Sequence, residues 1–219
     1  MQERPVSDLA EIFEAELLVE EPGARYNIAP TDAAVVVVER DDRRALTEYR
    51  WGLIPHWAAD TRIAARTFNA RAESIATMPA FRESFRRRRC LVPVDGFYEW
   101  RRLEDGGRQP YRIFRSDGRP LALAGLWSGW KSPDSGEIRR TFTIVTTTPN
   151  ALVAQLHDRM PVIIPDDAWG RWLAPGPENP GELRALLEPT EEVQLAITPA
   201  SRLVNDVRND GPQLLLALD

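Results

Sequence analysis

The sequence predicts an α+β fold, a single domain over residues 1–219 with a curved, mostly antiparallel, barrel-like sheet and short helices at its periphery. Strand-like segments joined by turns such as "EDGGRQ", "SDGRP" and "SPDSGE" follow one another between residues 91 and 147, and such meanders curl into barrels or sandwiches. The strands do not alternate regularly with helices, so a doubly wound parallel sheet is not expected. The length of 219 residues lies within the range of about 200 to 250 at which β-rich chains form one domain.

The first part of the chain predicts two helical segments and two strands. From Ser7 onward, apolar residues recur at helical spacing, namely Leu9, Ile12, Phe13 and Leu17. The turn-rich loop "ARYNIAPTD" leads into a β-branched strand from Ala33 to Glu39, which the turn "RDDRR" ends. "LTEYRWGLIPHW" predicts a second strand that stops at Pro55. Helical spacing returns from Glu73 to Arg89, with Pro79 placed to begin a new helix.

The rest of the chain predicts the meander and three short helices. The strands are expected at Leu91 to Trp100, Pro110 to Arg115, Leu121 to Trp127 and Thr141 to Thr147. The helices are expected at Asn150 to His157, Asp166 to Leu173 and Leu183 to Leu187, with a short strand "VII" between the first two.

Composition and charge exclude several classes of protein. With 43% apolar and 28% charged residues the chain can bury a sizeable core, so wholesale disorder is not expected. The longest apolar run, Ala33 to Val38, is too short to cross a bilayer, and the start, Met1 to Leu9, lacks the apolar segment of a secretory signal. We therefore expect a cytoplasmic protein without membrane contact. The net charge of -5 argues against a generally basic nucleic-acid binder but permits a local basic groove.

A metal site or another cofactor is not expected. Cys90 is the single cysteine, so the chain cannot form an internal disulfide or a cysteine-based zinc site. The two histidines, His56 and His157, lie far apart without the spacing of metal ligands. Cys90 begins an apolar strand, which favours a buried, inert thiol over a nucleophile.

Two ionisable side chains are candidates for proton transfer. Glu99 stands between Tyr98 and Trp100, where it is either a solvent-facing strand residue or a desolvated carboxyl group. His157 lies at the end of a predicted helix, just before Pro161, where it either caps or packs against the helix or belongs to a polar site at the junction.

Three further residues are candidates for contact with a substrate. "FNARAES" places Asn69 and Arg71 on one face if it is extended, where they either cap and face solvent or position a substrate and hold a phosphate. Trp57 follows a proline in a predicted loop and is a candidate for an exposed stacking surface.

Seven separated motifs together resemble one family. "RYNIAP", "WGLIPHW", "FNARAES", "CLVPVDGFYEW", "GLW", "FTIVTT" and "LHDRMPVII" occur in the order and at the intervals found in the SOS response-associated peptidase (SRAP) family. The resemblance runs from the first helix to about Asn209. It implies an α+β domain with a barrel-like core that recognises abasic sites in single-stranded DNA, forms a covalent thiazolidine crosslink through an N-terminal cysteine, and removes its own leader as a peptidase.

The resemblance also implies roles for individual residues. Glu99 would be the general acid and base, His157 would stabilise charge or move protons at the sugar oxygen, and Asn69 would orient the N-terminal amine. An amine that attacks a carbonyl needs such proton transfers, which a positioned Glu with His supplies. The residues expected to contact DNA are Arg71 and Arg159, which would hold phosphates, and Asn27, Pro30 and Trp57, which would line the groove.

The N-terminus departs from the family pattern. Family members open with Met-Cys-Gly-Arg-Phe, whereas this chain opens "MQERPVSDLAEIF", so Gln2 stands in the place of the nucleophilic cysteine. A start assigned too far downstream, a trimmed chain and a natural loss are the alternatives. As given, the chain is expected to bind single-stranded DNA weakly and to form no lasting crosslink, with Met1 capable of at most a reversible Schiff base through its amine.

Two other functions remain as alternatives. One is a noncovalent module that binds single-stranded DNA, which predicts salt-sensitive binding that ignores the abasic site. The other is a cysteine hydrolase that uses Cys90 with His157, although no sharp turn presents Cys90.

Overall fold

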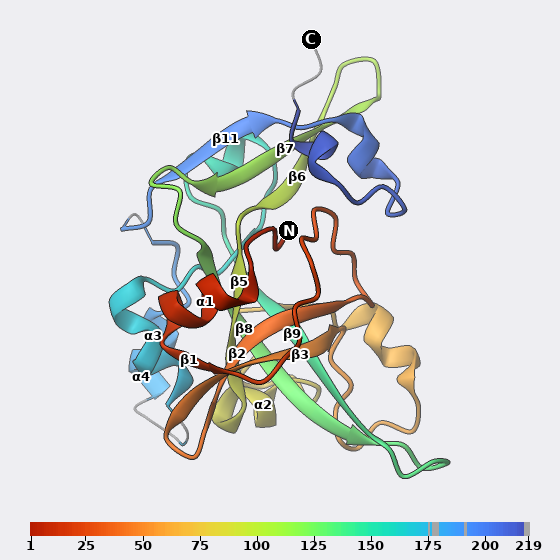
Figure 1. Cartoon of the computed structure of the whole chain (residues 1–219), viewed down its shortest axis with the longest axis vertical. Coiled ribbons are helices and arrows are strands. Elements are labelled where there is room, and N and C mark those ends of the chain that lie inside the picture. Colours follow the sequence, from red (N-terminus) through yellow and green to blue (C-terminus); the bar gives the residue numbers. More distant parts are fainter. Residues whose placement is uncertain (175, 177–179, 191, 217–219) are drawn as a thin grey trace.

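The computed structural model describes residues 1–174, 176, 180–190 and 192–216, and its strands form two sheets (Figure 1). The larger sheet contains β1 (Ala15–Leu17), β2 (Ala33–Arg40), β3 (Arg43–Trp51), β4 (Asn69–Arg71), β5 (Arg89–Val94), β8 (Leu121–Lys131), β9 (Ile138–Thr147) and β10 (Met160–Pro161). The smaller sheet contains β6 (Phe97–Arg102), β7 (Arg108–Arg115) and β11 (Leu195–Pro199).

The larger sheet closes into a barrel. Its strands run in the order β1-β3-β2-β5-β8-β9-β10, and β3 also pairs with β9, so β3, β2, β5, β8 and β9 form a closed ring. The pairs within the ring are antiparallel except at the closure, where Trp51 of β3 lies opposite Phe142 of β9 in parallel. The predicted α+β fold with a curved, mostly antiparallel, barrel-like sheet is therefore confirmed.

Side chains alternate along each strand, so one face of the larger sheet fills the inside of the barrel and the other face packs under the helices outside it. In β2, Ala34, Val36 and Val38 join the cluster inside the barrel, whereas Val35 and Val37 pack outside it. Helix α1 (Val6–Phe13) covers the outer face together with α3 (Trp169–Leu173), and Phe13 stacks on Trp169 with ring centroids 4.3 Å apart. Two further short helices are α2 (Arg82–Arg87) and α4 (Pro180–Ala185).

The three-stranded sheet lies at one end of the molecule, and the N-terminus lies between it and the barrel (Figure 1). The predicted single strand from Leu91 to Trp100 is wrong, because the chain leaves β5 of the barrel after Val94 and enters β6 of the other sheet at Phe97. Gly96 at this crossing lies so close to β7 that a Cβ atom there would be 2.7 Å from the carbonyl oxygen of Ile113. The crossing places Glu99 in the three-stranded sheet, facing the barrel end.

Several predicted helices are shorter than their apolar spacing suggested. The first ends at Phe13, because Glu14 adopts a left-handed conformation with φ of 51°, and Leu17 belongs to β1. Of the helix predicted from Glu73 to Arg89, α2 keeps only Arg82–Arg87, and the segment before it forms turns. The helices predicted at Asn150 to His157 and Asp166 to Leu173 are reduced to a 3₁₀ turn (Val153–Gln155), and to a 3₁₀ turn (Asp166–Ala168) followed by α3.

Candidate functional site

A cavity of about 840 Å³ opens between the barrel end and the three-stranded sheet. Inward-facing barrel residues such as Val92, Leu123 and Phe142 form its floor, and Phe97 to Trp100 of β6 form one wall. Of the residues singled out from the sequence, the cavity brings together Gln2, Asn27, Pro30, Asn69, Arg71, Glu99, His157 and Arg159. Trp57 is 54% exposed and does not line this cavity.

Glu99 is a desolvated carboxyl group in the cavity wall. Burial raises its pKa from the ordinary 4.5 to about 7, with the charge of His157 opposing the rise and that of Asp158 adding to it. The rise follows from the position of β6, which directs Glu99 into a space lined by apolar residues rather than into water. A carboxyl group with a pKa near 7 can both accept and donate a proton at neutral pH.

His157 lies beside Glu99 at the cavity rim and is about half exposed. Its Nδ1 accepts a hydrogen bond from the backbone N–H of Arg159 at 3.0 Å and lies 3.3 Å from a carboxylate oxygen of Asp158. The short turn from His157 to Arg159 therefore fixes the orientation of the imidazole ring.

Asn69 and Arg71 project from the same side of β4, as the spacing predicted. The strand runs parallel to β9, with Asn69 opposite Ile144 and Arg71 opposite Thr146, and only Ala70 between them is buried. Within the described part of the chain, neither side chain has a hydrogen bond or ion pair assigned to it, so both are available to a ligand in the cavity.

Arg159 is held in place before any ligand binds. Its two terminal nitrogens donate to both carboxylate oxygens of Glu73 at 2.5 and 2.9 Å, and one of them also donates to the carbonyl of Thr146 at 2.6 Å. This ion pair holds the pKa of Glu73 below its usual range. No local pattern indicates the pair, because Glu73 and Arg159 lie 86 positions apart in the sequence.

The N-terminal amine lies inside the cavity. The Met1 amine donates to the carbonyl of Gly96 at 3.1 Å, and the Met1 carbonyl accepts from the N–H of Asp95 at 3.1 Å. Burial lowers the pKa of this amine from 8.0 to about 6, an effect that the nearby carboxylate of Asp95 opposes. A neutral amine, which is the nucleophilic form, is therefore the main species at pH 7.

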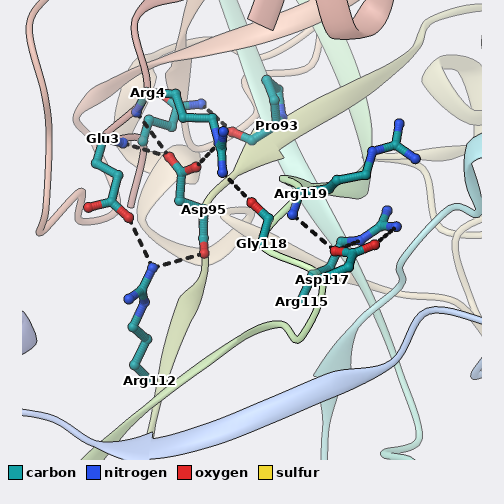
Figure 2. A network of polar contacts seen from close by, with 10 residues as sticks. Glu3, Arg4, Pro93, Asp95, Arg112, Arg115, Asp117, Gly118 and Arg119 are labelled. Carbon is teal, nitrogen blue, oxygen red and sulfur yellow. Dashed lines mark hydrogen bonds and ion pairs between the residues drawn. The ribbon is translucent and has the colours of Figure 1, made fainter. Parts of the chain in front are cut away.

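Asp95 fastens the segment that follows Met1 (Figure 2). Its buried carboxylate accepts from the N–H groups of Glu3 at 2.7 Å and Arg4 at 3.1 Å, and from the Arg4 guanidinium at 2.6 Å. Arg112 of β7 joins Glu3 at 2.9 Å, and Arg4 also donates to the carbonyl of Gly118. The network ties the start of the chain to both sheets, and sequence reasoning missed it.

Gln2 has a structural role and takes no part in the chemistry. Its side chain is buried and exchanges two hydrogen bonds with the backbone of Val35, at 2.7 and 2.9 Å, and donates to the carbonyl of Pro93 at 2.8 Å. The Gln2 backbone also pairs with Arg25. Gln2 thus joins the N-terminal segment to β2 and β5, and its amide is not a nucleophile.

Asn27 contributes to the cavity by holding its wall. Its buried amide donates to the carbonyls of Val204, Asp206 and Asn209, at 3.1, 3.3 and 3.1 Å. Pro30 lies exposed on the same loop at the cavity rim. Any contact of Asn27 with DNA is therefore indirect in this arrangement, whereas Pro30 is free to touch a ligand.

Cys90 does not take part in the site. It is fully buried inside the barrel and is not among the residues around the cavity, and burial raises the pKa of its thiol. The hydrolase that would use Cys90 with His157 therefore has no geometric support.

Tyr98 is a cavity residue that the sequence did not single out. Its hydroxyl is buried without a hydrogen-bond partner among the described residues, and burial raises its pKa to about 12. The described residues also contain no group of three His, Cys, Asp or Glu side chains placed to hold a metal ion, and no helix long and apolar enough to cross a membrane.

Comparisons with known proteins agree with the motifs. The family model described as SOS response associated peptidase (SRAP) matches residues 1–207. The abasic site processing protein YoqW of Bacillus subtilis is 38% identical over 190 residues, which cover 87% of this chain and 84% of that protein. The abasic site processing protein YedK of Escherichia coli is 31% identical over 212 residues, which cover 94% and 91%. A crystal structure of a Bacteroides thetaiotaomicron protein superposes with a TM-score of 0.87 at 26% identity and covers 99% of this chain and 97% of that one. The chain belongs to the SRAP family.

Proposed function

We propose that this protein recognises abasic sites in single-stranded DNA and binds the exposed sugar aldehyde in the cavity between its two sheets. One observation carries the proposal: Glu99, with a pKa of about 7, shares a cavity with a buried amine, an imidazole and an unpaired amide. The relatives named as abasic site processing proteins support the choice of lesion. An abasic nucleotide lacks a base, so its sugar can enter a cavity that a stacked nucleotide would not reach.

The chemistry follows from the groups that the cavity holds. An amine adds its lone pair to the aldehyde carbon, and the resulting hydroxyl leaves as water when the C=N bond of an imine forms. Glu99 takes the proton that the amine loses and returns a proton to the departing hydroxyl, and its pKa suits both steps. His157 is placed to stabilise charge on the sugar oxygen, and Asn69 to orient the amine.

The phosphates next to the lesion have two cationic partners. Arg71 is exposed at the cavity edge, and Arg159 is oriented by its ion pair with Glu73. Guanidinium groups bind phosphate through paired hydrogen bonds, which Arg71 is free to make, whereas Arg159 would exchange its pair with Glu73 for a phosphate. Pro30 and the exposed ring of Trp57 are further candidates for contact with flanking bases.

The residue that supplies the N-terminal amine determines how long the covalent product with the sugar lasts. In a chain that starts at Met1, the amine alone can react, and the imine reverses by hydrolysis. A lasting thiazolidine needs the thiol of an N-terminal cysteine to add to the same carbon, and self-processing would be the step that frees such a cysteine. Single-stranded DNA, covalent linkage and peptidase activity are all parts of this proposal.

The test is reductive trapping. The 219-residue protein is incubated with a single-stranded oligonucleotide that carries one abasic site, borohydride is added, and products are separated on a denaturing gel. We expect a trapped complex with the abasic strand and none with an intact strand of the same sequence. Equal noncovalent binding of both strands without trapping would replace the proposal with a noncovalent DNA-binding module.

A further inference from the structure

The barrel has a second end, opposite the cavity, and arginines gather there. In β2 the inward-facing row Ala34, Val36 and Val38 continues to Arg40, which is the last residue of the strand. Strand alternation therefore directs Arg40 toward the barrel axis, at the point where the apolar core stops.

Two neighbouring rows end in the same way. Arg88 precedes Cys90 of β5 on the inward-facing side, and its carbonyl extends the ladder by accepting from the N–H of Trp127 at 2.8 Å. In β9 the inward row of Ile144 and Phe142 reaches Arg140. We name the group formed by Arg40, Arg88, Arg140, Tyr49 and Trp127 the arginine end of the barrel.

Aromatic contacts hold the arginine end together. The rings of Tyr49 and Trp127 close the core with centroids 5.6 Å apart. Arg40 donates to the Tyr49 hydroxyl at 2.9 Å, and the positive charge of Arg140 acts on the same hydroxyl. The Arg88 guanidinium carbon lies 5.8 Å from the centroid of the half-buried Trp127 ring.

These positive charges are not neutralised by carboxylates. No ion pair is assigned to Arg40, Arg88 or Arg140 within the part of the chain that the structure describes. The acidic neighbours of Arg40 in sequence are Glu39, which strand alternation directs out of the barrel and which lies opposite Arg44, and Asp41, which lies exposed in the β2–β3 turn. A concentration of unpaired guanidinium groups in a chain of net charge -5 is not explained by composition alone.

The arginine end is separate from the cavity. The cavity floor separates them: Trp127 lies four residues, or about 13 Å, beyond the cavity residue Leu123 along β8, and Arg140 lies two residues, or about 7 Å, beyond the cavity residue Phe142 along β9. In Figure 1 the β2–β3 turn, α2 and the β8–β9 hairpin all lie on the side of the barrel away from the three-stranded sheet.

We propose that the arginine end is a second nucleic-acid contact, which binds the phosphodiester backbone of single-stranded DNA that flanks the lesion. Guanidinium groups at the ends of three neighbouring rows suit the spaced phosphates of a strand better than one compact carboxylate, because each can form paired hydrogen bonds with a separate phosphate. The inference rests on the proposed function for the choice of DNA as partner, and it goes beyond that function by adding a site remote from the reacting sugar.

The test compares matched arginine substitutions. The double variant R88Q/R140Q removes two charges from the arginine end and leaves the bond between Arg40 and Tyr49 in place. The control R171Q/R184Q removes two exposed arginines on α3 and α4. Binding of an intact single strand of about 30 nucleotides is measured against salt, since single-strand sites span about 4–16 nucleotides for one domain. Thermal unfolding of each variant shows whether it is folded. If R88Q/R140Q is not folded, the single variant R140Q, at an exposed position, replaces it in the binding measurement.

We expect the salt slope of the long strand to fall by about 1.4 in R88Q/R140Q, at about 0.7 for each phosphate that an arginine no longer neutralises. The control should keep the wild-type slope. A slope that is unchanged in R88Q/R140Q, or that falls equally in the control, would overturn the proposal. Borohydride trapping of an abasic strand by R88Q/R140Q, at a strand concentration that saturates the variant, separates the two proposals, because the variant keeps every cavity residue and trapping tests the cavity alone.

Discussion

The buried carboxyl group of Glu99 should make the protein less stable as the pH rises, and E99Q should remove this effect. In the folded protein the pKa is about 7, against 4.5 when the group is exposed. The folded state therefore holds its proton between pH 4.5 and 7 while the unfolded state has lost it. Stability falls with increasing pH wherever the native state binds more protons, so the loss develops across this window and is complete above a pH of about 7.

The size of the effect follows from the same pKa. At about 1.4 kcal/mol for each pKa unit, the rise corresponds to about 3 kcal/mol. Glu99 is partly solvent-exposed, so we discount this to about 2 kcal/mol. Glutamine has nearly the same shape and no charge, so E99Q should match the wild type near pH 4.5 and exceed it by about 2 kcal/mol at about pH 8.

Urea unfolding of both proteins at several pH values measures this difference directly. The buried amine of Met1 has the opposite effect, because its lowered pKa makes stability rise between about pH 6 and 8. Subtracting wild type from E99Q at each pH removes the amine's contribution. The exposed strand residue Glu48 provides the control E48Q. A difference that is independent of pH, or an E99Q protein that is less stable at alkaline pH, would show that Glu99 is not held protonated by desolvation.

Three other substitutions test the DNA contact, the N-terminal network and the barrel packing. R71Q should weaken binding of abasic and intact single strands alike and lower the salt slope by about 0.7, and a change confined to the abasic strand would contradict a phosphate contact. D95A should lower the free energy of unfolding by about 2–4 kcal/mol, because it leaves the backbone N–H groups of Glu3 and Arg4 and the Nε–H group of Arg4 without their acceptor. Denaturant unfolding that matches the wild type would contradict this. G125A should destabilise the barrel by about 1–3 kcal/mol, because the added Cβ would lie 2.7 Å from the Cys90 sulfur. The double variant C90A/G125A should recover part of the lost stability, and no recovery would show that the strain lies elsewhere.

Local patterns predicted the features of this fold that depend on neighbouring residues. Alternation over "FNARAES" placed Asn69 and Arg71 on one face, and β4 has them so. The aromatic neighbours of Glu99 allowed either a solvent-facing strand residue or a desolvated carboxyl group, and the structure decides for the second, because burial raises its pKa. Alternation wrongly predicted one continuous strand through Asp95 and Gly96. The chain changes sheets there, and no pattern among the neighbouring residues indicates the change.

Contacts between distant segments could not be predicted. The bonds from Glu3 and Arg4 to Asp95 join positions 92 and 91 apart, and the pair of Glu73 with Arg159 joins positions 86 apart. The apolar spacing from Glu73 to Arg89 predicted helical structure with a new helix from Pro79, but Ile75, Phe81 and Phe85 reach the core from turns as well as from α2. The apolar pattern therefore identified which side chains are buried but not the backbone conformation of the segment that carries them.

Whether the cavity acts on the sugar of an abasic site can be decided by replacing residues 1–5, which precede α1, with Met-Cys-Gly-Arg-Phe. Removal of the initiator methionine then leaves an N-terminal cysteine at the position of Gln2. The substituted and the unmodified proteins are each incubated with an abasic single strand, without reductant, and run on a denaturing gel. We expect a lasting complex for the substituted protein only, because Cys supplies the thiol that Met1 and Gln2 lack. If neither protein gives a complex while both bind the strand reversibly, the cavity does not perform this chemistry.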